Sequence, residues 1–211
     1  MLIEQLVTGP FQENTYLVAK DRGSECVLID PGDEADRIAA RIEELALTPV
    51  MILNTHGHLD HIGAVPDLKE RYDIPFAIHP GDGFLLKNVA QQAAAYGLDG
   101  YRDPEVDVDL VAGENVKVAG LEFEVVFTPG HSPGHVTFVA PGVVFSGDCL
   151  FMGSIGRSDL PGGDPAVLKK TLKDVFLAMP DETVVHSGHG PSTTIGAERE
   201  TNPFLNGAMP W

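Results

Sequence analysis

Apolar runs and turn residues alternate at the start of the chain. Residues 2–7, 14–19 and 25–29 are strand-like, and Gly9-Pro10 and Asp21-Arg22-Gly23 separate them. Short apolar runs bounded by glycine, proline and aspartate are typical of strands joined by turns. The pattern therefore predicts that the chain opens with a meander of three strands.

From residue 34 onward, helical and strand-like patterns alternate. Apolar side chains recur at helical spacing over residues 34–47 and again over 62–72. Between them, Val50-Met51-Ile52-Leu53 is continuously apolar, as expected of a strand buried on both faces, and residues 75–78 form another strand-like run. This alternation predicts an α/β progression. Residues 83–97 are helix-like with a weak apolar face, which fits either a surface helix or a cap over a site.

The second half of the chain returns to strand-like patterns. Residues 107–110, 115–118 and 121–127 read as strands, and Ala119-Gly120 predicts a tight hairpin between the last two. Two shorter strands and one helix are predicted after them, at 143–145, 183–185 and 194–201. We therefore expect two sheets, built from two similar halves, in one α/β domain that covers residues 1–211.

Composition limits the classes of partner. Of the 211 residues, 43% are hydrophobic, which is enough for a well-buried core. Fourteen basic residues against 31 acidic ones give a formal charge of −17, which disfavours nucleic acid and anionic membrane surfaces as partners. No apolar run approaches membrane-spanning length. A small-molecule substrate fits this composition better than a polyanion.

Cysteine usage and the start of the chain indicate a compartment. Cys26 and Cys149 are too few for a disulfide framework, and Cys149 is expected in the core. The start Met1-Leu2-Ile3-Glu4 lacks the basic region and apolar core of a signal peptide. We therefore expect a cytoplasmic protein, whose oligomeric state the sequence leaves open.

Histidines are concentrated directly after the apolar run at 50–53. Thr55-His56-Gly57-His58-Leu59-Asp60-His61 places three imidazoles and a carboxylate within six positions. Spacing by two directs His56, His58 and Asp60 to one side of an extended or slightly curled backbone, and His61 enters the following helix. Imidazole and carboxylate together suit zinc, iron or manganese. Loop histidines that bind nothing are the alternative, but this density after a buried strand favours a metal site.

Other strand ends also supply histidine or aspartate. His131 and His135 follow the strand at 121–127, and the residues alone allow either to bind a metal. Asp148 follows the strand at 143–145, and His186 and His189 follow the one at 183–185. The convergence of four strand ends is a stronger indication than any one of them. Asp30, after the strand at 25–29, either accepts a hydrogen bond from a ligand histidine or caps a turn. His79 is interpreted as a structural or surface residue.

These motifs resemble those of a known superfamily. THGHLDH, GHSPGH, SGDCLF and SGHG, in this order and opened by LIDPG, are similar to the metallo-β-lactamase superfamily over nearly the whole chain. The greatest similarity is to glyoxalase II-like hydrolases, in particular the short bacterial kind that carries a segment like GSIGRSDLPGG at 153–163. The resemblance implies a four-layer αββα sandwich, with metals in a shallow groove at one edge of the two sheets.

The resemblance also implies a ligand set for two divalent ions, zinc in preference to iron or manganese. It makes His56, His58 and His131 the ligands of one ion. Asp60, His61 and His189 become the ligands of the second ion, and Asp148 bridges the two. Asp30 and His135 then support ligands from behind, and His186 is supporting or structural. Arg157 is a candidate for binding a substrate carboxylate or for pairing with an acidic ligand, and the alternative is a loop arginine in solvent.

The implied activity is hydrolysis of a thioester such as S-lactoylglutathione to lactate and glutathione by a metal-bridging hydroxide, with Asp60 as ligand and proton acceptor. No GxSxG motif indicates a serine nucleophile. Longer glyoxalase II enzymes contact glutathione through a C-terminal helical domain, whereas only 194–201 is predicted to be helical after His189 here. Glutathione recognition is therefore the open part of this interpretation. The alternatives are an iron-dependent persulfide dioxygenase, another hydrolase such as a lactonase or β-lactamase, and a metal-binding module without catalysis.

Overall fold

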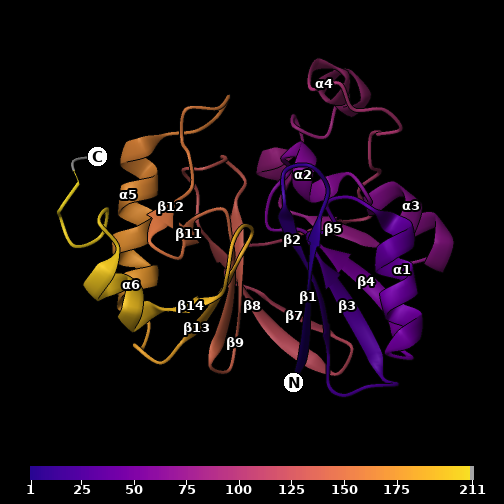
Figure 1. The fold of residues 1–211 in the computed structure, drawn as a ribbon, viewed down its shortest axis with the longest axis horizontal. Helices are drawn as coiled ribbons and strands as arrows, with labels where there is room; N and C mark the ends of the chain where they lie inside the picture. Colours follow the sequence, from indigo (N-terminus) through magenta and orange to yellow (C-terminus); the bar gives the residue numbers. More distant parts are fainter. Residues whose placement is uncertain (210–211) are drawn as a thin grey trace.

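The computed structural model describes residues 1–209, and its first sheet contains six strands (Figure 1). In spatial order they are β1 (Leu2–Thr8), β2 (Glu13–Ala19), β3 (Glu25–Ile29), β4 (Thr48–Leu53), β5 (Phe76–Ile78) and β6 (Val108–Asp109). The first three pair antiparallel, which confirms the predicted meander. The pairs from β3 to β6 are parallel, so the chain must cross over between them. Helices α1 (Ala35–Glu44) and α3 (Val65–Tyr72) lie in two of these crossovers.

The second sheet also has six strands within the described residues. Their spatial order is β14 (Thr193–Thr194), β13 (Val184–Ser187), β10 (Val143–Gly147), β9 (Val136–Ala140), β8 (Leu121–Phe127) and β7 (Asn115–Val118). Ala119 and Gly120 join β7 to β8 with φ of 52° and 65°. Two consecutive positive φ angles match the right-handed twist of a hairpin, so the predicted tight turn is confirmed. The short strands β11 (Leu150–Phe151) and β12 (Ser154–Ile155) form a separate ribbon.

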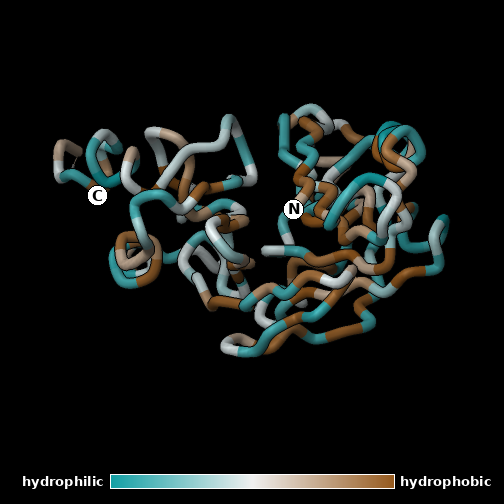
Figure 2. Tube along the Cα trace, turned by 90° about the horizontal axis from the view of Figure 1, so that it is seen from below, coloured by the Kyte–Doolittle hydropathy of each residue, from teal (hydrophilic) through white to brown (hydrophobic). Residues whose placement is uncertain are grey.

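Alternating side chains hold the layers together. Tyr16, Val18 and Val27 point between the two sheets and pack with Phe123 and Phe138 of the second sheet. The intervening residues of the first sheet pack outward against α1 and α3. The outer face of the second sheet packs against α5 (Pro165–Asp174) and α6 (Ile195–Thr201). Helices therefore flank both sheets in Figure 1, and hydrophobic and hydrophilic segments alternate along the chain in Figure 2. The expected αββα sandwich is confirmed.

The helix predicted over 62–72 is wrong in its extent. The structure has a single-turn helix, α2 (Leu59–Ile62), and then α3, with a break at Gly63. A Cβ at Gly63 would collide with the Tyr101 ring and with the Gly32 carbonyl oxygen, so the chain passes too close to its neighbours for a larger residue. Because α2 begins at Leu59, Asp60 is helical, whereas the spacing predicted an extended or slightly curled backbone up to this residue.

The segment 83–97 also differs from its prediction. Only α4 (Val89–Ala95) is helical there, and it follows the 3₁₀ turn η1 (Pro80–Asp82) and a non-helical stretch. Figure 1 shows α4 apart from the helix layers, beyond the sheet ends. The sequence patterns did not predict β9, α5 or the 3₁₀ turn η2 (Phe176–Ala178).

Candidate metal centre

Three histidines from two loops converge on one point. The Nδ1 atom of His58 lies 2.8 Å from Nε2 of His131, and that atom lies 3.2 Å from Nε2 of His56. His56 and His58 follow β4, and His131 lies in the loop between β8 and β9. One nitrogen from each ring falls within a sphere small enough for a single ion, the atoms lying within 4.8 Å of one another. These residues are called the first group below.

A second group lies beside the first. Asp60 and His61 come from α2, and His189 follows β13, with Nε2 of His189 at 3.3 Å from Oδ2 of Asp60. Asp148, after β10, reaches both groups. Its Oδ1 is 3.4 Å from Nε2 of His61, and its Oδ2 is 3.5 Å from Nε2 of both His131 and His189. The structure thus brings together all seven residues that the resemblance implied as ligands.

The chemistry of these atoms fits a bound cation. Nε2 of His61 and Oδ1 of Asp148 face each other, yet both are buried and neither forms a hydrogen bond within residues 1–209. Buried polar atoms in proteins nearly always have a partner, so two facing atoms without a hydrogen bond indicate a further partner such as an ion. His131 donates from Nδ1 to the Arg157 carbonyl oxygen at 2.6 Å, which orients its Nε2 towards the first group.

Protonation states differ between the two groups. Burial, followed by neighbouring imidazoles, lowers the pKa of His56 and lowers the pKa of His58 to about 3, so both rings are neutral at neutral pH and carry free lone pairs. Burial also disfavours a charged His61, but the carboxylates of Asp148 and Asp60 outweigh it and raise the pKa of His61 well above its usual value. The second group is therefore negative enough to hold a proton on its imidazole, and a divalent cation can take that proton's place.

One buried carboxylate supports both groups from behind. Asp30 accepts hydrogen bonds from the Thr55 backbone N–H and hydroxyl, both at 2.6 Å, and its Oδ2 lies 3.1 Å from Nδ1 of His61. The same Thr55 hydroxyl lies 3.0 Å from Nδ1 of His56. Asp30, His56 and His61 also offer three atoms that lie within 4.8 Å of one another, but both Asp30 oxygens already accept hydrogen bonds. Of the two interpretations left open for Asp30, the contacts match the supporting one.

Asp82 is a buried residue that the sequence patterns did not single out. Its carboxylate accepts from the Gly57 N–H at 3.0 Å, the Ser132 hydroxyl at 2.6 Å and the Gly134 N–H at 2.5 Å. Gly57 lies between His56 and His58 of the first group, and Ser132 follows His131. Asp82 therefore joins the two loops that form this group. Its position just beyond β5, which is parallel to β4, could have indicated it, since parallel strand ends meet at one edge.

Glu13 is a second unpredicted carboxylate. It is 1% exposed, its Oε2 accepts from the hydroxyls of Thr8 and Thr15, and its Oε1 lies 3.8 Å from Nδ1 of His61. Burial raises the pKa of Glu13 well above its usual value. A glutamate at the start of a strand, flanked by Gln12 and Asn14, carries no sequence signal of such burial.

The remaining candidates take supporting places. His135 is fully buried, accepts the Asp148 N–H at 3.1 Å and contacts the Thr128 hydroxyl, so it fixes the Asp148 backbone. His186 stacks on Phe145 with ring centroids 5.3 Å apart. Three further side chains contact the protein rather than either group. His79 packs on Phe127, Cys149 is buried, and Arg157 pairs with Asp159 at 2.8 Å.

A cavity of about 670 Å³ opens over both groups. His58, Asp60, His131, Asp148 and His189 line it, together with residues from the β1–β2 turn, from α4 and from the segment 151–161. The volume lies in the range of small-molecule sites. The 83–97 segment therefore contributes to the cavity, as the cap interpretation required.

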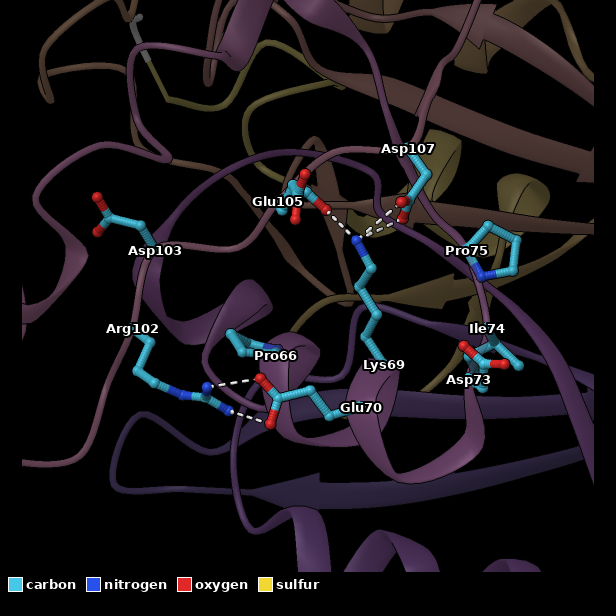
Figure 3. A pocket seen from close by; sticks show the side chains of 10 residues that line it. All are labelled: Pro66, Lys69, Glu70, Asp73, Ile74, Pro75, Arg102, Asp103, Glu105 and Asp107. Atoms are coloured by element: carbon cyan, nitrogen blue, oxygen red, sulfur yellow. Dashed lines mark hydrogen bonds and ion pairs between the residues drawn. The ribbon is translucent and has the colours of Figure 1, made fainter.

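A second cavity, of about 440 Å³, lies away from these groups between α3 and the 102–107 segment (Figure 3). Its two cations are already paired: Lys69 with Asp107 at 2.7 Å, and Arg102 with Glu70 and Asp67 at 2.7 and 2.6 Å. No cluster of metal-binding atoms among the described residues lies there. These ion pairs attach the 102–107 segment to α3 and offer no chemistry.

Comparison with known proteins decides the family. The sequence profile of the Metallo-beta-lactamase superfamily matches residues 8–189. The chain belongs to this superfamily. Hydroxyacylglutathione hydrolase GloC of Haemophilus influenzae is 40% identical over 215 residues, which cover 98% of this chain and 99% of that protein. The family match and the clustered histidines and aspartates together place the chain in a superfamily of metal-dependent hydrolases.

Solved structures agree with this assignment. The B3 metallo-beta-lactamase BLEG-1 has a TM-score of 0.91 at 38% identity, covering 97% of this chain and 99% of that chain. TTHA1623, solved in a di-iron-bound form, has a TM-score of 0.87 at 48% identity, covering 96% and 100%. Within residues 1–209, no helix has the length and apolar character that crossing a membrane requires.

Proposed function

We propose that this protein is a binuclear metal-dependent hydrolase that cleaves thioesters of the hydroxyacylglutathione type, such as S-lactoylglutathione. The observation that carries the proposal is the pair of adjacent ligand groups, with Asp148 within 3.5 Å of residues in both. The 40% identity to GloC supports the substrate class, and the di-iron form of TTHA1623 supports two ions. Zinc is the proposed metal, with iron or manganese as alternatives, because imidazole and carboxylate ligands suit all three.

Two divalent ions, when bound, supply a water of lowered pKa and polarise the scissile carbonyl. The chain's own residues hold and orient the reactants. His56, His58 and His131 would hold one ion, and Asp60, His61 and His189 the other, with Asp148 shared. Asp30, through Thr55, and the Arg157 carbonyl oxygen fix the imidazole orientations from behind. These contacts reduce the rearrangement needed when substrate binds.

Asp60 is the proposed proton acceptor. Burial disfavours its charged form, but His61 and His189 outweigh that effect and lower the pKa of Asp60, so the carboxylate is ionised at neutral pH. It also lines the cavity, where a water attacking the substrate would lie. In the net reaction a C–O bond forms and the C–S bond breaks, giving a carboxylate, a thiol and one released proton.

One experiment tests site and substrate together: quantification of metals in the purified protein, followed by hydrolysis of S-lactoylglutathione by the same sample. We expect two divalent ions per chain and release of free thiol. One iron per chain, with oxygen uptake on glutathione persulfide, would replace the proposal with a dioxygenase. Cleavage of a lactone or β-lactam without thioester cleavage would assign another hydrolase. No cleavage of any ester class by the loaded protein would indicate a metal-binding module.

A further inference from the structure

Two exposed aromatic rings face each other beside the candidate metal centre. Phe11, in the turn between β1 and β2, and Tyr96, at the C-terminal end of α4, have ring centroids 5.4 Å apart and ring planes at 89°. Both line the cavity that contains the ligand groups. They are 37% and 64% exposed. Large apolar side chains left exposed inside a site indicate contact with a bound molecule. Together they are called the aromatic wall.

The rest of the cavity offers few free polar groups. Apart from the metal-binding residues, the polar groups of its lining are the side chains of Gln92 and Arg157 and the Tyr96 hydroxyl. The Gln92 amide donates to the carbonyl oxygens of Leu85 and Lys87, and the Arg157 guanidinium makes two 2.8 Å hydrogen bonds to Asp159. The amide N–H groups of Gln92 and the Arg157 guanidinium are thus already engaged by the protein. The apolar and aromatic lining residues are Phe11, Leu59, Leu85, Ala95, Tyr96, Phe151, Ile155, Leu160 and Pro161.

We propose that the aromatic wall binds an apolar acyl group, so that the preferred substrates are thioesters with a bulky apolar or aromatic acyl chain. This inference rests on the proposed thioester hydrolysis. Glutathione carries two carboxylates and one ammonium group, and the lining supplies a single arginine that is already paired. The acyl part therefore gains more from this cavity than the thiol part, which extends towards solvent. A lactoyl methyl group is too small to cover both rings.

The test measures selectivity rather than activity alone. The full-length, metal-loaded protein is assayed with S-mandeloylglutathione and S-lactoylglutathione, and it is titrated calorimetrically with the corresponding acids, mandelate and lactate. We expect the phenyl-bearing compounds to be favoured on the order of tenfold, because one additional ring is buried. Tyr96→Ala should reduce that preference about fivefold, whereas Tyr96→Phe should retain it because the ring remains.

Phe127→Ala is the matched control, since Phe127 is an exposed aromatic, 42% accessible, that does not line the cavity. Taking the ratio of the two substrates cancels any change in metal loading. Equal affinity of the wild-type protein for mandelate and lactate would overturn the inference, as would a preference that survives Tyr96→Ala combined with Phe11→Ala. If mandelate is preferred but no thioester is hydrolysed, the proposed function fails and the apolar acyl site stands.

Discussion

At the scale of single residues, the candidate centre depends on hydrogen-bond partners behind the two groups. Asp30 illustrates this, because its Oδ2 contacts His61 of the second group directly and His56 of the first group through the Thr55 hydroxyl. Its backbone has a φ of 49°, so the chain adopts a left-handed conformation at this position. Such a conformation is uncommon for aspartate and is retained where surrounding contacts fix it.

Replacing Asp30 should weaken metal binding at both groups. In Asp30→Asn, one carboxylate oxygen becomes an NH₂ that cannot accept from the Thr55 donors or His61, and ligand orientation is lost. Outer hydrogen-bond partners of this kind affect metal affinity by roughly 10–100-fold. Competition titrations with a chromophoric chelator measure this for each ion. Thr55→Val removes the hydroxyl that contacts His56 and Asp30 but leaves the direct contact between Asp30 and His61, so it should weaken the first group more than the second. Equal weakening of both groups by Thr55→Val would contradict this account.

Replacing Asp60 should lower turnover far more than it lowers the stability of the fold. Asp60→Asn keeps an oxygen ligand but loses the negative charge that accepts a proton, so we expect turnover to fall about 100-fold or more, within the range of general-base contributions. Stability should change far less, since the Asp60 side chain is 21% exposed at the cavity. Thermal unfolding and metal analysis accompany the kinetics. Full metal content with unchanged turnover would rule out the acceptor role.

The clustering of the seven candidate residues could be predicted from the sequence because each one follows an apolar strand, and the pattern of strands is local. Choosing among the histidines was different: the residues alone could not separate His131 from His135, and the resemblance made that choice. In the structure, His135 points to the Asp148 backbone N–H and His131 to the first group. Glu13 could not be predicted, since its burial results from packing against His61 and Gly32, which are distant in sequence.

At the scale of elements, the centre is formed by loops at strand ends, and the loops need fixing relative to one another. The loop after β4 and the loop between β8 and β9 belong to different sheets. Asp82, just beyond β5, accepts three hydrogen bonds from these two loops. A buried carboxylate held by three donors is rigid, and each bond to a charged group contributes about 1.5–3 kcal/mol.

Asp82→Asn should therefore impair the first group selectively. The amide retains the size of the carboxylate but brings an NH₂ against N–H and O–H donors, which separates the loops and lowers affinity for one ion. Glu198→Gln is the matched control, because Glu198 is also buried and accepts from Gly153, Thr193 and Asn202 but touches no ligand. Both variants should lose stability in denaturant titrations, and only Asp82→Asn should lose an ion. Two tightly bound ions in Asp82→Asn would contradict the prediction.

The helices and strands were predicted correctly where the periodicity is strong. They were predicted wrongly where contacts with distant parts of the chain determine the bounds of an element. The meander and the hairpin at 119–120 carry clear turn signals. The helix over 62–72 broke at Gly63 because Tyr101 and Gly32 pack against it, which no local pattern reveals. Residues 83–88 are held by contacts such as the Asn88 N–H to Asp103, rather than by helical hydrogen bonds. Strand β9 follows directly on the motif 127–135, whose glycines and prolines hide its start.

At the scale of the whole molecule, the candidate centre lies where the two sheets meet. His56, His58, Asp60 and His61 follow β4 of the first sheet, whereas His131, Asp148 and His189 follow strands of the second. Direct contacts between the sheets are present nearby: the Tyr16 hydroxyl donates to the Ser187 carbonyl oxygen at 2.7 Å, and the Asn14 N–H donates to that of Gly188 at 2.8 Å. Bound ions would add further cross-links at this junction.

Removing one proposed ligand at a time should show that the two groups bind their ions separately. His189→Asn removes a ligand of the second group only, so we expect one retained ion per chain. His131→Asn removes a ligand of the first group and should leave the second group occupied, but more weakly. Metal counts after gel filtration distinguish the two. Loss of both ions in His189→Asn would show that the two groups bind their ions as one unit, which contradicts the division into a first and a second group.

Complete chelation should lower the thermal midpoint of unfolding. An ion that binds only the folded chain, at about a thousandfold excess over its dissociation constant, stabilises by about 4 kcal/mol. For a chain of this size, 1 kcal/mol corresponds to roughly 2–4 °C, so we expect a fall on the order of 10 °C for each ion lost. Because the proposed ions would join the two sheets, the transition should stay single while its midpoint shifts. Calorimetry with and without chelator measures this, with zinc added back as the control. An unchanged midpoint in a sample proven to be metal-free would mean that the contacts between the two sheets at Tyr16 and Asn14 hold the sheets together without bound ions.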